Sequence, residues 1–309
     1  MYKVIYICIY FQEMSKLKGY LYGSISAATY GLVPLFSLPV MAKNVPFDTI
    51  LCYRFLIASL IIAGVMKIKK ISFKVSGKEF ATLTILGLLF ALCAIFLLFS
   101  YEYMAAGIAT TILFLYPLFV AVIMAIIFKE RINTVTGICM AIAMCGVAML
   151  YWGDDSGGLN PIGILYILLS GLTYALYIVT VNKSNVGEMS GLKLTFYSMS
   201  IASLLFFIKA MTGEGLSMLP DSMAVVNLLL LGIIPTVISC VTLVYAVQYI
   251  GSTYTAVLGA LDPVTAVIVG ILVFSEPFTP NLAIGICMII GAVTLIILSG
   301  NRKKTCQKN

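Results

Sequence analysis

The segment Gly19-Tyr-Leu-Tyr-Gly-Ser-Ile-Ser-Ala-Ala-Thr-Tyr30 has a counterpart 144 residues later, Gly163-Ile-Leu-Tyr-Ile-Leu-Leu-Ser-Gly-Leu-Thr-Tyr174. Tyr22, Ser26 and Tyr30 fall on tyrosine, serine and tyrosine in that counterpart. Matches of this kind continue in the same order over about 130 residues, which chance similarity between apolar helices does not produce. Further pairs are Tyr53 with Tyr197, Ala58-Ser-Leu60 with Ala202-Ser-Leu204, Pro117 with Pro263, Glu130 with Glu276, and Gly137-Ile-Cys-Met140 with Gly285-Ile-Cys-Met288.

The composition indicates a chain that lies mostly in lipid. Of its 309 residues, 61% are hydrophobic and only 10% are charged, whereas soluble domains carry about 25% charged residues. The mean hydropathy is +1.09. A bilayer-spanning helix needs roughly 20 apolar residues, so ten of them would use about 200 residues. This leaves no room for a large soluble catalytic domain.

Several kinds of chemistry are excluded by what the sequence lacks. There is no histidine, so Ser-His catalysis, imidazole metal sites and histidine proton relays are ruled out. The eight cysteines form no CxxC pair and mostly lie in apolar stretches, where they act as small hydrophobic residues. No P-loop occurs. We therefore expect no cofactor, no bound metal, no nucleic-acid partner and no enzymatic activity.

Apolar runs separated by polar breaks predict an all-α membrane protein with ten transmembrane helices. The net charge of +7 is then topology information, because cytoplasmic loops collect lysine and arginine. With the N-terminus inside, 16 of the 19 lysines and arginines fall on the inner side, so both termini are predicted to be cytoplasmic. The predicted helices are 19–41, 48–66, 80–101, 106–128, 134–152, 161–182, 192–211, 223–248, 253–274 and 281–299.

Five helices per copy is an odd number, so the second copy must cross the membrane in the opposite sense to the first. Two such inverted repeats around a central cavity are a transporter architecture, in which the halves exchange conformations and open the cavity to each side in turn. The predicted units are an N-terminal extension 1–15, with translation starting at Met1 or Met14, a first repeat 16–152, an outer linker 153–160, a second repeat 161–300 and a basic cytoplasmic tail 301–309.

The chain resembles the EamA type of the drug/metabolite transporter superfamily over nearly all of 16–300. The resemblance is carried by Tyr53-Arg-Phe-Leu-Ile-Ala58, by Leu115-Tyr-Pro-Leu-Phe119 leading to Phe128-Lys-Glu-Arg131, and by Leu261-Asp-Pro263 leading to Ser275-Glu-Pro277. It implies a ten-helix bundle with a cavity lined by helices 1, 3, 4, 6, 8 and 9, and the export or exchange of small metabolites. The second repeat has Ser198 where the first has Arg54, so a role of the arginine is not duplicated.

Asp262 is the acid nearest the centre of a predicted helix, where a charge must be neutralised, paired or hydrated. It would bind a cationic group or a coupling proton, or it would only cap a restarted helix together with Pro263. Arg54 would snorkel to the interface, pair with Asp48 or Glu102, or attract anionic solutes. Pro34, Pro117 and Pro263 are predicted helix breaks.

Tyrosine and hydroxyl side chains are the other cavity candidates, since a tyrosine face near mid-bilayer offers stacking area and a hydroxyl group. The alternative for each is ordinary helix packing with interhelical hydrogen bonds. These candidates are Tyr30, Tyr174, Tyr177, Thr110, Thr111, Tyr116, Ser239, Thr242, Tyr245 and Tyr254.

The sequence thus predicts a secondary transporter in the cytoplasmic membrane of a bacterium. It would move an amino acid or related small solute outward by alternating access, driven by the solute gradient or by protons through Asp262. A passive channel for small solutes is the competing hypothesis. The expected partners are the solute, lipid and, in the coupled version, protons, and the expected oligomeric state is a monomer or weak dimer.

Overall fold

The computed structural model describes residues 2–104, 109, 112–130, 133–150, 160–213, 215–274 and 280–302, and within these ranges all regular secondary structure is helical. The helices are α1 (Tyr2–Tyr30), α2 (Val33–Met41), α3 (Phe47–Ile68), α4 (Gly77–Tyr103), α6 (Tyr116–Ile126), α7 (Thr134–Leu150), α8 (Pro161–Lys183), α9 (Gly191–Thr212), α10 (Ser222–Gly232), the π-helix η1 (Ile233–Ile238), α11 (Ser239–Ile250), α12 (Ser252–Leu258), α13 (Leu261–Phe274) and α14 (Pro280–Arg302).

Six helical segments of the described chain are long and apolar enough to cross a membrane. Three shorter apolar helices accompany them: Tyr116–Ile126, Thr134–Gly146 and Ala283–Leu295. An all-helical membrane protein is therefore confirmed, while the count of ten full spans stays a prediction. The six long segments are Lys16–Met41, Phe47–Ile68, Gly77–Tyr103, Pro161–Lys183, Gly191–Thr212 and Ser222–Ile250.

Local sequence signals explain where several helices begin. Ser76 and Glu79 form a capping box at the start of α4, in which each side chain accepts a hydrogen bond from the other residue's backbone N–H. Asn160 caps α8, where Pro161 occupies the first turn. The side chain of Asp221 accepts a hydrogen bond from the Ala224 backbone at the start of α10.

Three predicted breaks coincide with positions where a helix begins again in the middle of the bundle. The first predicted helix is divided at Gly31-Leu32, and Pro34 lies in the first turn of α2. Pro117 lies in the first turn of α6. Gly259-Ala260 separates α12 from α13, whose first turn holds Pro263. A proline in a first turn costs no hydrogen bond, because the first N–H groups of a helix have no intrahelical partner.

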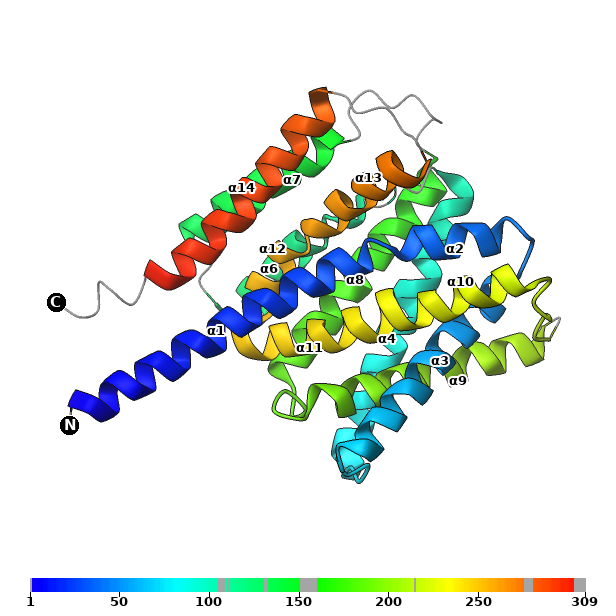
Figure 1. Cartoon of the computed structure of the whole chain (residues 1–309), viewed down its shortest axis with the longest axis horizontal. Helices are drawn as coiled ribbons and strands as arrows, with labels where there is room; N and C mark the ends of the chain where they lie inside the picture. The colour runs from blue at the N-terminus through cyan, green and yellow to red at the C-terminus, as the bar shows by residue number, and fades with distance from the viewer. Residues whose placement is uncertain are drawn as a thin grey trace.

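The helices pack mainly in four pairs: α3 with α9, α4 with α8, α1 with α11, and α7 with α14. The α7–α14 pair runs along one side of the molecule, and the other pairs build the main body (Figure 1). The hydrophobic core lies in that body, where buried side chains of α3, α4, α8, α9 and α11 meet. Among the described cysteines, Cys52, Cys93, Cys139 and Cys240 are buried and free, as expected for small hydrophobic residues.

One long segment contains a wider turn. The chain runs from α10 through η1 into α11 without interruption, and Pro235 lies inside η1. The Thr236 hydroxyl donates a hydrogen bond to the Leu231 carbonyl at 2.7 Å. A π-helical turn of this kind often marks a functional position within an α-helix.

Candidate functional site

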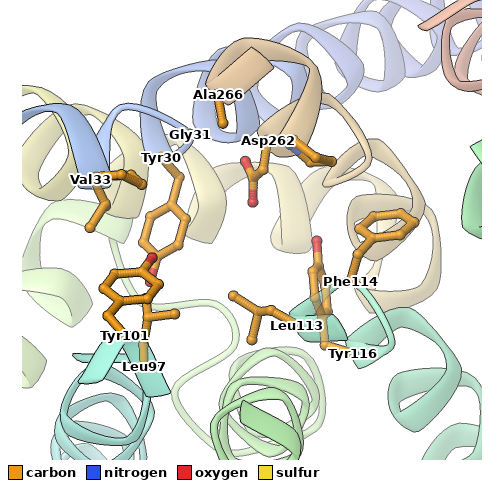
Figure 2. Close-up of a pocket in the computed structure, with 12 residues that line it drawn as sticks. Tyr30, Gly31, Val33, Leu97, Tyr101, Leu113, Phe114, Tyr116, Asp262 and Ala266 are labelled. Atoms are coloured by element: carbon orange, nitrogen blue, oxygen red, sulfur yellow. The ribbon is translucent and has the colours of Figure 1, made fainter. Parts of the chain in front are cut away.

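A small pocket lies where the three broken helices meet α4. Its open volume is about 30 Å³, which holds one or two water molecules and no metabolite. Three side chains predicted from the sequence, Asp262, Tyr30 and Tyr116, line it together, with the carboxyl group of Asp262 between the two tyrosines (Figure 2). The lining residues are Tyr30, Gly31, Val33, Pro34, Leu97, Tyr101, Leu113, Phe114, Tyr116, Asp262, Pro263 and Ala266.

The Asp262 carboxyl group points into this pocket (Figure 2). Its Oδ1 atom is buried and has no hydrogen-bond partner in the described part of the chain. Asp262 lies inside the first turn of α13, which begins at Leu261, and its backbone N–H donates to the Gly259 carbonyl at 2.9 Å. The expected N-cap is therefore absent, because the carboxylate makes no capping bond among the described residues. An ionised carboxylate at this position would lie at the favourable, N-terminal end of the helix.

Three tyrosines from three helices form one cluster, and two of them, Tyr30 and Tyr116, line the pocket with Asp262. The rings of Tyr30 and Tyr174 are stacked, with centroids 6.0 Å apart and planes at 9°. The ring of Tyr116 meets Tyr174 edge to face at 4.9 Å, and its hydroxyl donates to the Ala256 carbonyl at 3.1 Å. Tyr174 thus supports two of the tyrosines that line the pocket, Tyr30 and Tyr116. These contacts bring together three residues that the sequence proposed independently.

Two glycines allow this close packing. A Cβ atom added at Gly31 would lie 2.4 Å from the backbone carbonyl oxygen of Asp262, and one added at Gly259 would lie 1.5 Å from the Tyr116 hydroxyl. Neither position has space for a side chain while its neighbour stays in place. Gly31 therefore lets α1 approach the first turn of α13, and Gly259 makes room for Tyr116.

Arg54 occupies a second buried polar position, and the prediction that it would snorkel or pair with an acid was wrong. Its side chain is only 2% exposed. Its Nε donates to the Thr236 hydroxyl at 2.7 Å, and the guanidinium lies 5.5 Å from the Phe55 ring centroid. Asp48 is paired instead with Lys209, at 2.8 Å. The face of α3 that carries Arg54 is turned toward the π-helix, away from lipid.

The remaining candidates lie away from the pocket. Ser239 contacts Ser26 at 3.3 Å between hydroxyl oxygens, inside the α1–α11 packing. Thr242 donates to the Ile238 carbonyl at 2.7 Å, so its hydroxyl serves its own helix. Tyr177 is fully buried against Phe90, with ring centroids 5.2 Å apart.

The last tyrosine candidates pack elsewhere on α1. Tyr245 contacts Tyr22 with ring centroids 5.6 Å apart, and Tyr254 meets Tyr20 edge to face at 6.4 Å. The hydroxyl candidates Thr110 and Thr111 lie outside the described residues. Tyr245 and Tyr254 thus fit the alternative of ordinary helix packing better than they fit a role in lining the cavity.

Sequence reasoning missed two features of the region. Tyr101 lines the pocket from α4, and its only signal was a phenol near the end of an apolar helix. Thr236 was missed as the partner of Arg54, because no feature of the sequence predicts a π-helix at Pro235.

Comparison with known proteins assigns the chain to a family. The model of the EamA-like transporter family matches twice, at residues 17–152 and 161–298. An uncharacterized transporter of Clostridium kluyveri is 23% identical over 93% of this chain and 94% of its own length, and the uncharacterized transporter YdfC of Bacillus subtilis is 25% identical over 73% and 74%. A solved crystal structure shares the fold, with a TM-score of 0.78 at 16% identity over 91% of this chain and 98% of that one. The chain belongs to the EamA-like transporter family and is a multi-pass membrane protein.

Proposed function

We propose that the protein is a secondary transporter that exports a small metabolite by alternating access, with Asp262 binding the coupling proton or a cationic group of the solute. One observation carries this proposal: the Asp262 carboxyl group, whose buried Oδ1 has no hydrogen-bond partner among the described residues, points into a pocket between broken helices. A charge at such a position is costly unless something neutralises it. A proton or an ammonium group would do so, and exchange between the two would couple their movements.

The contacts between helices support two inverted five-helix repeats. If the repeats are related by a twofold axis, helices 2 and 5 should pair with their own equivalents, helices 7 and 10. Helix 1 with 8 and helix 3 with 6 should then form two equivalent pairs. Counted in chain order, predicted helices 2, 5, 7 and 10 are α3, α7, α9 and α14, and predicted helices 1, 3, 6 and 8 contain α1, α4, α8 and α11. The observed pairs α3–α9, α7–α14, α1–α11 and α4–α8 therefore follow that scheme. The twice-matching family model agrees with the same division.

The position of the pocket also fits alternating access. Tyr116 and Asp262 occupy equivalent positions in the two repeats, because the sequence shift of 146 that relates Pro117 to Pro263 relates them too. The pocket is therefore built from matching helix restarts, which supports a location on the proposed repeat axis. Its small volume corresponds to a closed state between the two open ones. Discontinuous helices at a repeat interface are typical of transporter sites.

Ion pairs close both ends of the bundle between the proposed repeats. On the predicted outer side, Lys43 pairs with Asp221 and Lys209 pairs with Asp48. On the predicted inner side, Lys183 pairs with Glu130. All three pairs are partly exposed, and such pairs contribute only about 0–1 kcal/mol each. They could therefore open and close readily during a transport cycle in the bacterial cytoplasmic membrane.

Transport in proteoliposomes tests the proposal. Purified protein would be reconstituted with a pH-sensitive dye inside, and amino acids, amines and nucleosides would be added one at a time. The proposal expects that an accepted solute shows saturable counterflow and moves protons the other way. A passive channel would show neither saturation nor trans-stimulation.

Asp262→Asn then tests the assigned residue, with Glu102→Gln as the control, because Glu102 is an exposed acid outside the pocket. We expect Asp262→Asn to abolish transport driven by a pH gradient, and Glu102→Gln to retain it. Survival of pH-driven transport in Asp262→Asn would refute the coupling role.

A further inference from the structure

Five lysines gather around the connection between α3 and α4, on the predicted inner side of the membrane. The segment 67–78, called here the basic loop, contains no acidic residue, and its five lysine side chains are all exposed. Their ammonium groups take part in no ion pair and no side-chain hydrogen bond within the described part of the chain. The five are Lys67, Lys69, Lys70, Lys74 and Lys78.

The basic loop is held against the beginning of α9. The backbone carbonyl of Phe73 accepts a hydrogen bond from the Tyr197 hydroxyl, and that of Lys74 accepts one from the Lys193 ammonium group. The ring of Phe73 also meets Phe196 edge to face, with centroids 5.3 Å apart. The five lysines are therefore carried on a docked segment and not on a free tether.

The second proposed repeat docks its equivalent connection without lysines. Between α9 and α10, the backbone N–H of Ser217 donates to the Thr49 hydroxyl at the beginning of α3, at 3.2 Å. The shift of 144 relates Thr49 to Lys193, so the same helix position binds the connection in both repeats. The equivalent segment 211–222 contains no lysine or arginine and two acids. Docking therefore does not require the five lysines, and their charge is available to another partner.

Apolar side chains are exposed beside these lysines. Ile68 is 82% exposed and Phe80 is 49% exposed. The acid next to the loop, Glu79, is engaged in the capping box with Ser76. Lysines orient a helix whether or not exposed apolar side chains accompany them, so topology alone does not account for the combination. A cationic surface edged by apolar side chains matches a phospholipid with an anionic headgroup.

From these observations we propose that the basic loop is a binding site for the headgroups of anionic phospholipids. The lysine ammonium groups would contact the headgroup phosphate as point charges, and Ile68 and Phe80 would lie against the acyl chains. One basic residue near an anionic membrane surface strengthens binding by about fivefold, and salt screens the effect. The site is independent of the transported solute, since the loop does not line the pocket that holds Asp262.

Native mass spectrometry of the purified full-length protein in detergent tests the site. The probes are phosphatidylglycerol, which is anionic, and phosphatidylcholine, which is zwitterionic, with identical acyl chains. One variant replaces all five lysines of the basic loop by glutamine, and a second replaces them by arginine, which keeps the charge. The matched control removes almost the same charge from the same predicted side, by glutamine replacement of Arg302, Lys303, Lys304 and Lys308.

We expect the wild type to bind phosphatidylglycerol roughly 10-fold or more tightly than phosphatidylcholine, with a preference that falls as the salt concentration rises. The glutamine variant should lose this preference, whereas the arginine variant and the tail variant should keep it. An unchanged preference in the glutamine variant would overturn the site. So would an equal loss in the tail variant, because net charge and not this loop would then govern binding.

A measurement on the wild type alone covers the case in which the glutamine variant inserts wrongly, since lysines also orient the chain. Acetylation of lysines would be followed by mass spectrometry in nanodiscs of either lipid. The five lysines should react several-fold more slowly in phosphatidylglycerol, whereas Lys183, which is already paired with Glu130 on the same side, should change little. Equal rates in the two lipids would overturn the site.

Soluble glycerol phosphate separates a lipid from a free phosphate compound. Added to phosphatidylcholine nanodiscs, it should leave the acetylation rates of the five lysines unchanged, because it lacks the acyl chains. Protection as strong as that by phosphatidylglycerol would identify a soluble phosphate compound as the ligand and would overturn the lipid site.

Discussion

Replacing Gly259 by alanine is the sharpest test of how the pocket is built. The new Cβ would lie 1.5 Å from the Tyr116 hydroxyl and 2.7 Å from the ring carbon that bears it, so the ring must move. The move breaks the hydrogen bond from Tyr116 to the Ala256 carbonyl and the edge contact with Tyr174. A hydrogen bond and an aromatic pair of this kind contribute about 1 kcal/mol each, so we expect Gly259→Ala to cost about 2 kcal/mol.

Thermal unfolding in detergent measures the effect, and about 2 kcal/mol corresponds to a fall in Tm of roughly 4 °C. Gly64→Ala is the control, because a Cβ at Gly64 meets no atom within 4 Å, and alanine favours a helix by up to about 1 kcal/mol over glycine. Tyr116→Phe removes the nearest clashing atom, so adding it to Gly259→Ala should destabilise less than the sum of the two single changes. If Gly259→Ala is as stable as Gly64→Ala, the packing of Tyr116 against Gly259 is not what shapes the pocket.

In a chain without its native cysteines, Met218→Cys should react with an impermeant maleimide only from outside the cell, and Lys69→Cys only from inside. Labelling of both from one side would contradict the inverted topology. The Lys43 ammonium, followed by the Ala224 backbone N–H, holds the pKa of Asp221 below its ordinary value of 3.8. Because the pKa of folded Asp221 is the lower one, its stabilising effect is present above about pH 4 and lost as the pH falls through the folded pKa. Asp221→Asn should therefore lower the Tm at neutral pH, and the difference from wild type should shrink in acid; a constant difference would refute this assignment.

The spans could be predicted from the sequence because they depend on length and hydrophobicity alone. The predicted helices 48–66, 161–182 and 192–211 agree with α3, α8 and α9 to within a few residues. The first helix differs, because α1 begins at Tyr2 and no proline or glycine interrupts it before Gly19. Predicted helix 253–274 is divided at Gly259-Ala260 into α12 and α13.

The site was harder to predict, because it depends on which way a helix face points. Asp262, Tyr30 and Tyr116 could be proposed from chemistry, since a deep acid and mid-helix phenols are unusual in lipid. The environment of Arg54 could not, because its distance from the helix end allows snorkelling equally well when only the sequence is known. Only tertiary packing against Thr236 determines where the Arg54 side chain lies.

The π-helix η1 determines which neighbouring helices the second half of a long helix contacts. Before it, α10 packs against α2 and α3; after it, α11 packs against α1 and α9. A π turn holds about one residue more than an α turn, which rotates everything downstream by roughly 100° about the same axis. Deleting one residue from Ile233–Ile238 would restore a regular spiral and swing Ser239 away from Ser26. A one-codon insertion in an ancestral gene would thus be enough to redirect α11 and create the contact surface it now shares with α1.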